Sequence, residues 1–182
     1  NKYLNKSDLN KKDRALITEL VYGTLKYKYT IDCILKNFIK SNLEKMNKDI
    51  LNMLRISIYQ LKYLDKIPEF AVVNEAVEFS KNISMKLSKL VNGVLRNYLR
   101  NKDNLCFTDK EDKIDRICFE YSFPGWMAEL FINQYGEDLG KCIMNSLNIV
   151  PKVTVRINTL KTDYKCAWDE LCINGYDVKK GN

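Results

Sequence analysis

The chain has 182 residues, of which 46% are hydrophobic and 29% are charged; this predicts one globular domain, or one domain and part of another, and excludes a disordered chain. No apolar run approaches the roughly 18 residues of a membrane span, and the first residues are polar, so we expect a soluble cytoplasmic protein without a membrane partner. The net charge is +7, and residues 1–105 hold 20 Lys and Arg against 11 Asp and Glu. This asymmetry suggests a polyanionic partner, although a lysine-rich composition alone would also produce it.

Apolar residues at helical spacing predict the elements of the first hundred residues. One long helix, or two stacked ones, opens at Asp13 and runs to Phe38. Asn47 is the predicted N-cap of the next helix, Pro68 starts a third, and a fourth covers 86–100. Short connections between these helices favour a compact antiparallel bundle. The fourth helix is expected to bury Leu87, Leu90, Val91, Val94 and Tyr98.

Three features of this bundle predict close contacts. Gly23 and Gly93 lie inside helices, where glycine costs about 1 kcal/mol relative to alanine, so another element is expected to approach each closely. Asn74 and Glu75 are expected to form a hydrogen bond between helices, or else to contact RNA or a neighbouring domain.

The sequence after the bundle begins with a charged linker and returns to helical spacing. Pro124 is predicted to open a helix that ends near Gly136, and a shorter helix then reaches Asn148. From Pro151 the hydrophobic period changes to two, which is typical of a strand, and the expected strand is KVTVRIN at 152–158.

The last predicted elements follow that strand. A helix is expected at 164–174 with Gly175 as its C-cap, and 176–179 could begin a second strand. The fold class is therefore mainly α, a helical bundle followed by a helical bridge and the start of a small α+β subdomain. The predicted domains are 1–105, 106–150 and 151–182.

Six cysteines and no histidine limit the possible chemistry. No two cysteines are spaced as Cys-x-x-Cys, so we predict no zinc site and no metal ligands, and we expect reduced, buried cysteines. Without histidine, no Ser-His or Cys-His nucleophile pair can form. The seven glycines never form Gly-x-Gly, the start of a phosphate-binding loop.

Three stretches, in this order and spacing, resemble the helical domain of the antitermination factor NusB. They are DRALITELVYGTLKYKY at 13–29, IPEFAVVNEAVEF at 67–79 and LVNGVLR at 90–96. The later stretches YSFPGWMAELFINQYGED, 121–138, and VTVRINTLKTD, 153–163, resemble the bridge and first subdomain of the Sun or RsmB family of 16S rRNA (cytosine-5) methyltransferases.

The resemblance implies an RNA-binding, substrate-positioning segment of an S-adenosylmethionine-dependent rRNA methyltransferase. Its expected partners are ribosomal RNA and its own downstream catalytic domain, which would bind the cofactor and follow Asn182. The alternative is a stand-alone NusB-type transcription antitermination or elongation factor, and a further one is a structural helical module for protein contacts. The resemblance also implies that the family's first helix precedes this sequence, which would leave an apolar groove beside Leu16, Leu20 and Leu54.

No catalytic or cofactor-binding residue is predicted within the chain. The family's two reactive cysteines follow proline and threonine, and none of the six cysteines here has either residue before it. The chemistry also needs a base and a held sulfonium methyl group, for which the sequence offers no motif.

The predicted site is an RNA-binding surface made of basic residues. Two arginines and a lysine share one face of the fourth helix, and lysines alternate with tyrosines near residue 27, as in nucleic-acid-binding segments that combine phosphate contact with stacking. Solvated charged faces or ion pairs, including pairs with linker acids in 109–112, would also explain these residues. The candidates are Arg14, Lys26, Lys28, Lys89, Arg96, Arg100 and Arg156.

Overall fold

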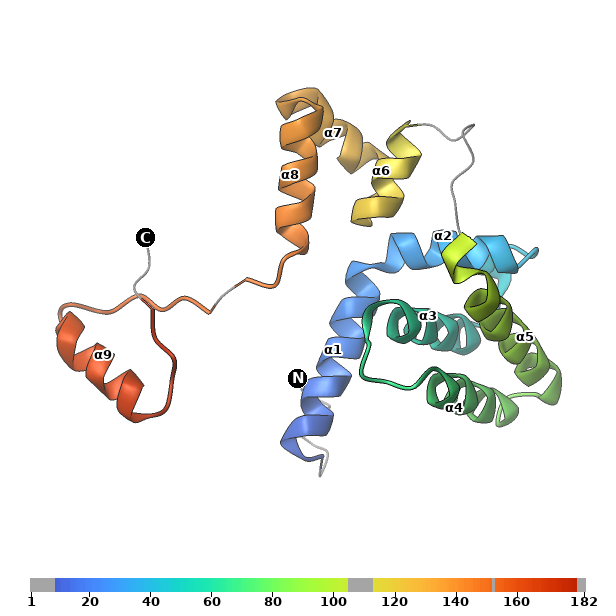
Figure 1. The fold of residues 1–182 in the computed structure, drawn as a ribbon, viewed down its shortest axis with the longest axis horizontal. Coiled ribbons are helices and arrows are strands. Elements are labelled where there is room, and N and C mark those ends of the chain that lie inside the picture. The colour runs from blue at the N-terminus through green and yellow to red at the C-terminus, as the bar shows by residue number, and fades with distance from the viewer. Residues whose placement is uncertain (1–8, 105–112, 152, 180–182) are drawn as a thin grey trace. The chain divides into compact units, whose positions relative to one another are not determined.

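The structure is a computed structural model that describes residues 9–104, 113–151 and 153–179 (Figure 1). Within these ranges the chain is helical, and no strand is formed, so the mainly α class is confirmed. Spatial contacts divide the chain into two units, Asn1–Asn148 and Ile149–Asn182. No helix in the described part is long and apolar enough to cross a membrane. The helices are α1 (Lys11–Lys26), α2 (Lys28–Phe38), the 3-10 turn η2 (Leu43–Lys45), α3 (Lys48–Tyr63), α4 (Glu69–Lys81), α5 (Met85–Asn101), the 3-10 turn η3 (Lys102–Asn104), α6 (Lys113–Tyr121), α7 (Gly125–Tyr135), α8 (Glu137–Asn148) and α9 (Tyr164–Ile173).

Side-chain caps and prolines set where these helices begin. The Asn47 side chain accepts hydrogen bonds from the backbone N–H groups of Asp49 and Ile50 at 3.0 and 3.1 Å, which confirms it as the N-cap of α3. Pro68 precedes α4 as predicted, because its fixed φ suits a helix start. Asn10 caps α1, three residues before the predicted start.

The first predicted helix is two helices, separated at Tyr27. This residue ends α1 with φ −95° and ψ 17° and begins α2. Its ring stacks on Tyr63 with centroids 4.2 Å apart and lies 6.3 Å from Tyr59. Burial raises the pKa of Tyr63 and also that of Tyr59, whose hydroxyl donates to Glu19 at 2.5 Å. The bend is thus fixed by an aromatic cluster between α1 and α3.

The main core lies between α1, α2, α3, α4 and α5, where each fully buried aliphatic side chain contributes about 1.5–3 kcal/mol. Most expected core positions are confirmed, but Leu90 is 39% exposed, because it falls at the edge of the buried face of α5. An apolar groove was expected beside Leu16, Leu20 and Leu54. Leu54 has no exposed surface, so the expectation is wrong at this residue, whereas Leu16 is 44% exposed. The fully buried side chains here include Ile31, Ile34, Leu35, Ile50, Leu54, Ile58, Val91 and Leu95.

The glycines within the helices differ in whether the structure leaves space for a side chain at their positions. A Cβ on Gly23 would lie 2.0 Å from the Tyr59 ring, so the close approach predicted there is confirmed. A Cβ on Gly93 would meet nothing within 4 Å, so the close approach predicted there is wrong. A Cβ on Gly140, which the sequence did not single out, would lie 3.2 Å from the backbone of Phe131, so glycine lets α8 pack closely on α7.

The helices α6, α7 and α8 form a smaller core that packs against α2. Thr30 ties α2 to this group, since its hydroxyl donates to the Phe119 carbonyl at 2.6 Å and its backbone N–H donates to the Ser122 hydroxyl at 3.3 Å. Cys118 is buried in this core. The expectation of buried cysteines is wrong for three others, which are exposed on α8 and α9: Cys142, Cys166 and Cys172.

The unit Ile149–Asn182 has local rather than core structure in its described residues. The predicted strand at 152–158 is wrong, because no neighbouring segment pairs with the described residues 153–158, and Val153 is 95% exposed. Asp163 caps α9 through the Cys166 N–H at 2.8 Å. Gly175, with φ 83°, lies just past the C-cap and completes a Schellman turn.

Candidate nucleic-acid interface

Six of the seven predicted RNA-binding residues belong to the first unit and one belongs to the second. In the first unit they form two groups, three residues on α1 and α2 and three on α5. The first group is Arg14, Lys26 and Lys28, the second is Lys89, Arg96 and Arg100, and the residue of the second unit is Arg156.

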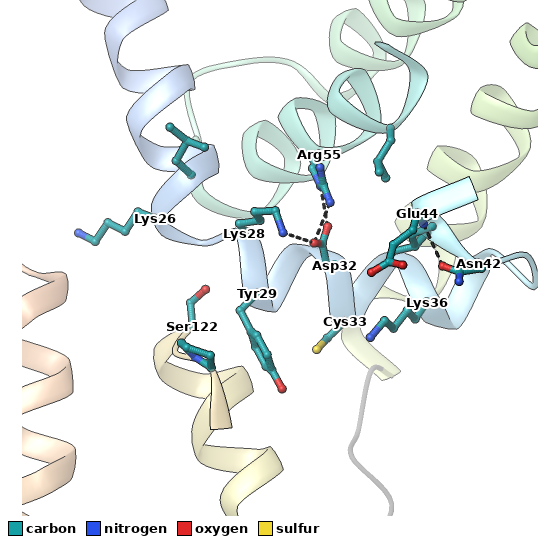
Figure 2. Close-up of a pocket in the computed structure, with 14 residues that line it drawn as sticks. Lys26, Lys28, Tyr29, Asp32, Cys33, Lys36, Asn42, Glu44, Arg55 and Ser122 are labelled. Carbon is teal, nitrogen blue, oxygen red and sulfur yellow. Dashed lines mark hydrogen bonds and ion pairs between the residues drawn. The ribbon is translucent and has the colours of Figure 1, made fainter. Parts of the chain in front are cut away.

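The basic corner, defined as Lys26, Lys28 and Arg55, has two of its cations in ion pairs (Figure 2). Arg55 donates to Asp32 through Nε at 2.7 Å and through a terminal nitrogen at 2.9 Å, and Lys28 donates to the same carboxylate at 2.9 Å. Asp32 and Arg55 are each only 17% exposed. The Arg55–Asp32 pair connects α2 to α3, whereas the Lys28–Asp32 pair lies within α2 and leaves Lys28 half exposed. Both cations therefore already have a carboxylate partner.

Lys26, the third cation of the basic corner, also makes an internal contact. Its ammonium donates a hydrogen bond to the carbonyl of Asn148, the last residue of α8, and lies 5.4 Å from the Tyr27 ring centroid. A cation at a helix C-terminus is stabilised by the unpaired carbonyls there. Figure 2 shows this side chain pointing away from the Asp32 ion pairs. Arg14, earlier on α1, is half-buried.

A cavity of about 570 Å³ lies beside this corner, between α2, η2, α3 and the turn before α7. Both signs of charge line it, since Lys36 and Glu44 join the residues of the ion pairs. Burial raises the pKa of Tyr29, on its wall, to about 12, so the phenol stays neutral. With carboxylates on its wall and its best-placed cations paired, the cavity is poorly suited to a polyanion.

The α5 face, defined as Lys89, Arg96 and Arg100, is different because all three side chains are exposed. Arg96 donates through Nε to the Asn92 side chain at 2.9 Å, a contact one turn away that orients the guanidinium without neutralising it. Within residues 9–104 and 113–179, no carboxylate pairs with any of the three cations. The predicted pairs with acids of 109–112 lie outside the described residues.

A groove between α4 and α5, with a volume of about 350 Å³, adjoins two residues of the α5 face. Phe70 on its wall is 71% exposed. The sequence reasoning missed this residue, although at 100° per residue it lies about 90° from the centre of the buried face of α4, where an aromatic ring has no core to enter. The groove is lined by Glu69, Phe70, Val73, Asn74, Arg96, Leu99 and Arg100.

Two other predicted features are open to solvent. Asn74 and Glu75 are exposed, and in the described part of the chain neither side chain hydrogen-bonds to another helix. The predicted hydrogen bond between helices is therefore wrong. Arg156 is exposed on the extended segment of the second unit.

Two family models match different parts of the chain, and the second begins within the first structural unit. Residues 1–100 match the NusB family, and residues 123–182 match the ferredoxin-like domain described as Methyltr_RsmF/B-like. A Bacillus subtilis protein named "Probable ribosomal RNA small subunit methyltransferase B" is 36% identical over 98% of this chain, which spans 40% of that relative's length. The Synechocystis protein of the same name is 36% identical over 87% of the chain and 36% of its own length.

A shorter kind of relative matches the helical part alone. The "Transcription antitermination protein NusB" of Listeria innocua is 41% identical over 43% of this chain and 63% of its own length. The chain thus spans well under half the length of the methyltransferase relatives and extends beyond the part shared with the antitermination protein. Since the family model covers more than half of it, the chain belongs to the NusB family, with its NusB domain joined to an RsmF/B-type ferredoxin-like segment.

Proposed function

We propose that this chain is the RNA-binding, substrate-positioning segment of an S-adenosylmethionine-dependent 16S rRNA cytosine-5 methyltransferase. The match of methyltransferase-named relatives along nearly the whole chain supports this. The segment 123–182 speaks against a stand-alone NusB-type factor, because the antitermination relatives do not extend over it. Its partners would be ribosomal RNA and a catalytic domain elsewhere in the same protein.

The observation that carries the RNA-binding part is the α5 face. Lys89, Arg96 and Arg100 present three exposed cations on one helix, and no carboxylate of the described residues pairs with them. Glu69, which lines the groove next to two of them, pairs with Lys102 instead. Arginine suits phosphate because its planar guanidinium can donate two parallel hydrogen bonds. Each phosphate that such a residue neutralises releases condensed counterions, which favours binding at low salt.

The described residues do not fit S-adenosylmethionine. They contain no glycine-rich strand–loop–helix, and in the cavity beside the basic corner the cations outnumber the carboxylates, which disfavours a sulfonium. We therefore assign no step of methyl transfer to them. In this proposal the segment contributes affinity and placement, while the attack on cytosine and the methyl donor belong to the catalytic domain.

Two binding experiments with the purified chain test this proposal. We expect it to bind 16S rRNA fragments with an affinity that falls steeply as salt rises, and to give no calorimetric signal with S-adenosylmethionine. RNA binding that is absent at low salt would favour a helical module for protein contacts. Cofactor binding at micromolar affinity would contradict the substrate-positioning role.

A further inference from the structure

We infer that the groove between α4 and α5 is a seat for one unpaired RNA nucleotide, in which Phe70 stacks on the base while Arg96 and Arg100 bind the adjoining phosphates. The inference rests on the proposed function and deepens it, because it names single-stranded RNA as the ligand and one subsite for it. Three observations carry it: an exposed ring, two available arginines and the concave groove that holds all three side chains.

The ring is the first observation. Phe70 has no polar atom, yet 71% of it is exposed, and it belongs to neither hydrophobic core. It lies in the first turn of α4, whose buried side is already filled by Val72, Val73 and Ala76. Packing among the described residues therefore does not explain a large aromatic residue at this position. A free aromatic face is the surface on which unpaired bases stack.

The second observation is the charge around the ring. Glu69 is the acid that lines the groove, and Lys102 donates to its carboxylate at 2.7 Å. The hydrogen bond to Glu69 raises the pKa of Lys102, so this ammonium stays charged and offsets the Glu69 carboxylate. Arg96 is oriented by Asn92 at 2.9 Å, and Arg100 has no ion-pair partner in the described part. The groove therefore keeps a positive excess beside the ring.

The shape of the groove favours an unpaired nucleotide over a duplex. Its volume of about 350 Å³ is at the small end of ligand pockets, a size suited to a single base rather than a helix. Bases in an A-form duplex stay stacked on each other and cannot reach a ring inside a groove. Asn74 lies on the wall with an exposed amide, which can donate to or accept from a base edge.

The test measures affinity of the whole chain for a single-stranded oligonucleotide and for a duplex of the same sequence. Phe70→Ala should weaken single-strand binding by about 5- to 150-fold, the loss expected for one stacked base, and should leave duplex binding unchanged. Phe70→Tyr keeps an aromatic face and should bind like the unmodified chain. The matched control is Phe79→Ala, which removes a ring that is 40% exposed at the other end of α4 and should have no effect.

The outcomes separate this inference from the proposed function. Salt-sensitive RNA binding that survives Phe70→Ala unchanged would overturn the inference alone, whereas no RNA binding by the unmodified chain would remove both. An equal loss for single strand and duplex would also overturn the stacking role. Binding of poly-glutamate that disappears in Phe70→Ala, with oligonucleotide binding intact, would assign the groove to an acidic protein partner. Circular dichroism checks that each variant folds, as expected for an exposed position.

Discussion

The basic corner and the α5 face have similar sequence character and opposite structural roles. Both place basic residues on helices near aromatic rings. In the corner, Arg55 pairs with Asp32 between α3 and α2, Lys28 pairs with Asp32 within α2, and Lys26 binds the end of α8, so each charge has a partner inside the protein. On the α5 face the cations remain exposed. A basic, aromatic-rich stretch therefore identifies a ligand surface only after its internal partners are known.

The largest effect is expected where the corner is packed most closely. Gly23→Ala would place a Cβ 2.0 Å from the Tyr59 ring, so we predict a loss of about 1–3 kcal/mol or more in the free energy of unfolding, measured with urea. Alanine normally stabilises a helix relative to glycine, so the packing conflict must outweigh that gain.

The matched control lies on α5. Gly93→Ala meets open space and should raise the free energy of unfolding by about 0.5–1 kcal/mol. If both alanine variants were equally stabilised, Tyr59 would not be packed against α1 as the structure has it.

A smaller loss is expected when the ion pairs of the corner are broken. Asp32→Asn leaves Arg55 only 17% exposed and without its carboxylate, which should cost about 1–2 kcal/mol in urea unfolding. RNA affinity should stay unchanged, because the RNA contacts are expected on the α5 face. Glu78→Gln serves as the comparison: its pair with Lys81 lies on the surface, and the change should stay within about 0.5 kcal/mol. A marked gain or loss of RNA affinity in Asp32→Asn would place the corner in the interface.

Local signals in the sequence predicted most of the helix boundaries. Asn47 and Pro68 mark helix starts through contacts within a few residues, and the structure confirms both. Contacts between distant residues were not predictable in this way. Lys26 meets Asn148 across 122 positions, and nothing in the sequence near either residue indicates it.

The predictions that the structure contradicts also depend on contacts between distant residues. The exposure of Leu90 depends on where the neighbouring helices contact α5. The spacing of apolar residues identifies the centre of the buried face of a helix but not its edges. The alternation at 152–158 predicts a strand, but a strand also needs a partner, which the described residues 153–158 do not have. Phe70 was not singled out in the sequence, because its exposure depends on where the buried face of α4 ends.

The smallest predicted effect is on the pH dependence of stability. It concerns Glu137, which belongs to neither the basic corner nor the α5 face. The hydrogen bonds from Lys113 and Lys141 lower the pKa of Glu137 from 4.5 to about 2. A lowered carboxylate pKa contributes stability above its unfolded value, and this contribution is lost as pH falls from about 4.5 through 2. Glu137→Gln should therefore lower Tm slightly at pH 7, with the two curves converging near pH 2. Curves that stay parallel across this range would show that the carboxylate does not stabilise the start of α8.

The central claim is that the α5 face, and not the basic corner, binds RNA phosphates. The direct measurement is the slope of log affinity against log salt for the unmodified chain and for two variants that each remove two charges. Arg96→Gln with Arg100→Gln should flatten the slope by about 0.7–0.9 for each lost contact, while Lys26→Gln with Lys28→Gln should leave it unchanged and lower stability instead. An unchanged slope in the arginine variant together with a flattened slope in the lysine variant would contradict the account and move the interface to the corner.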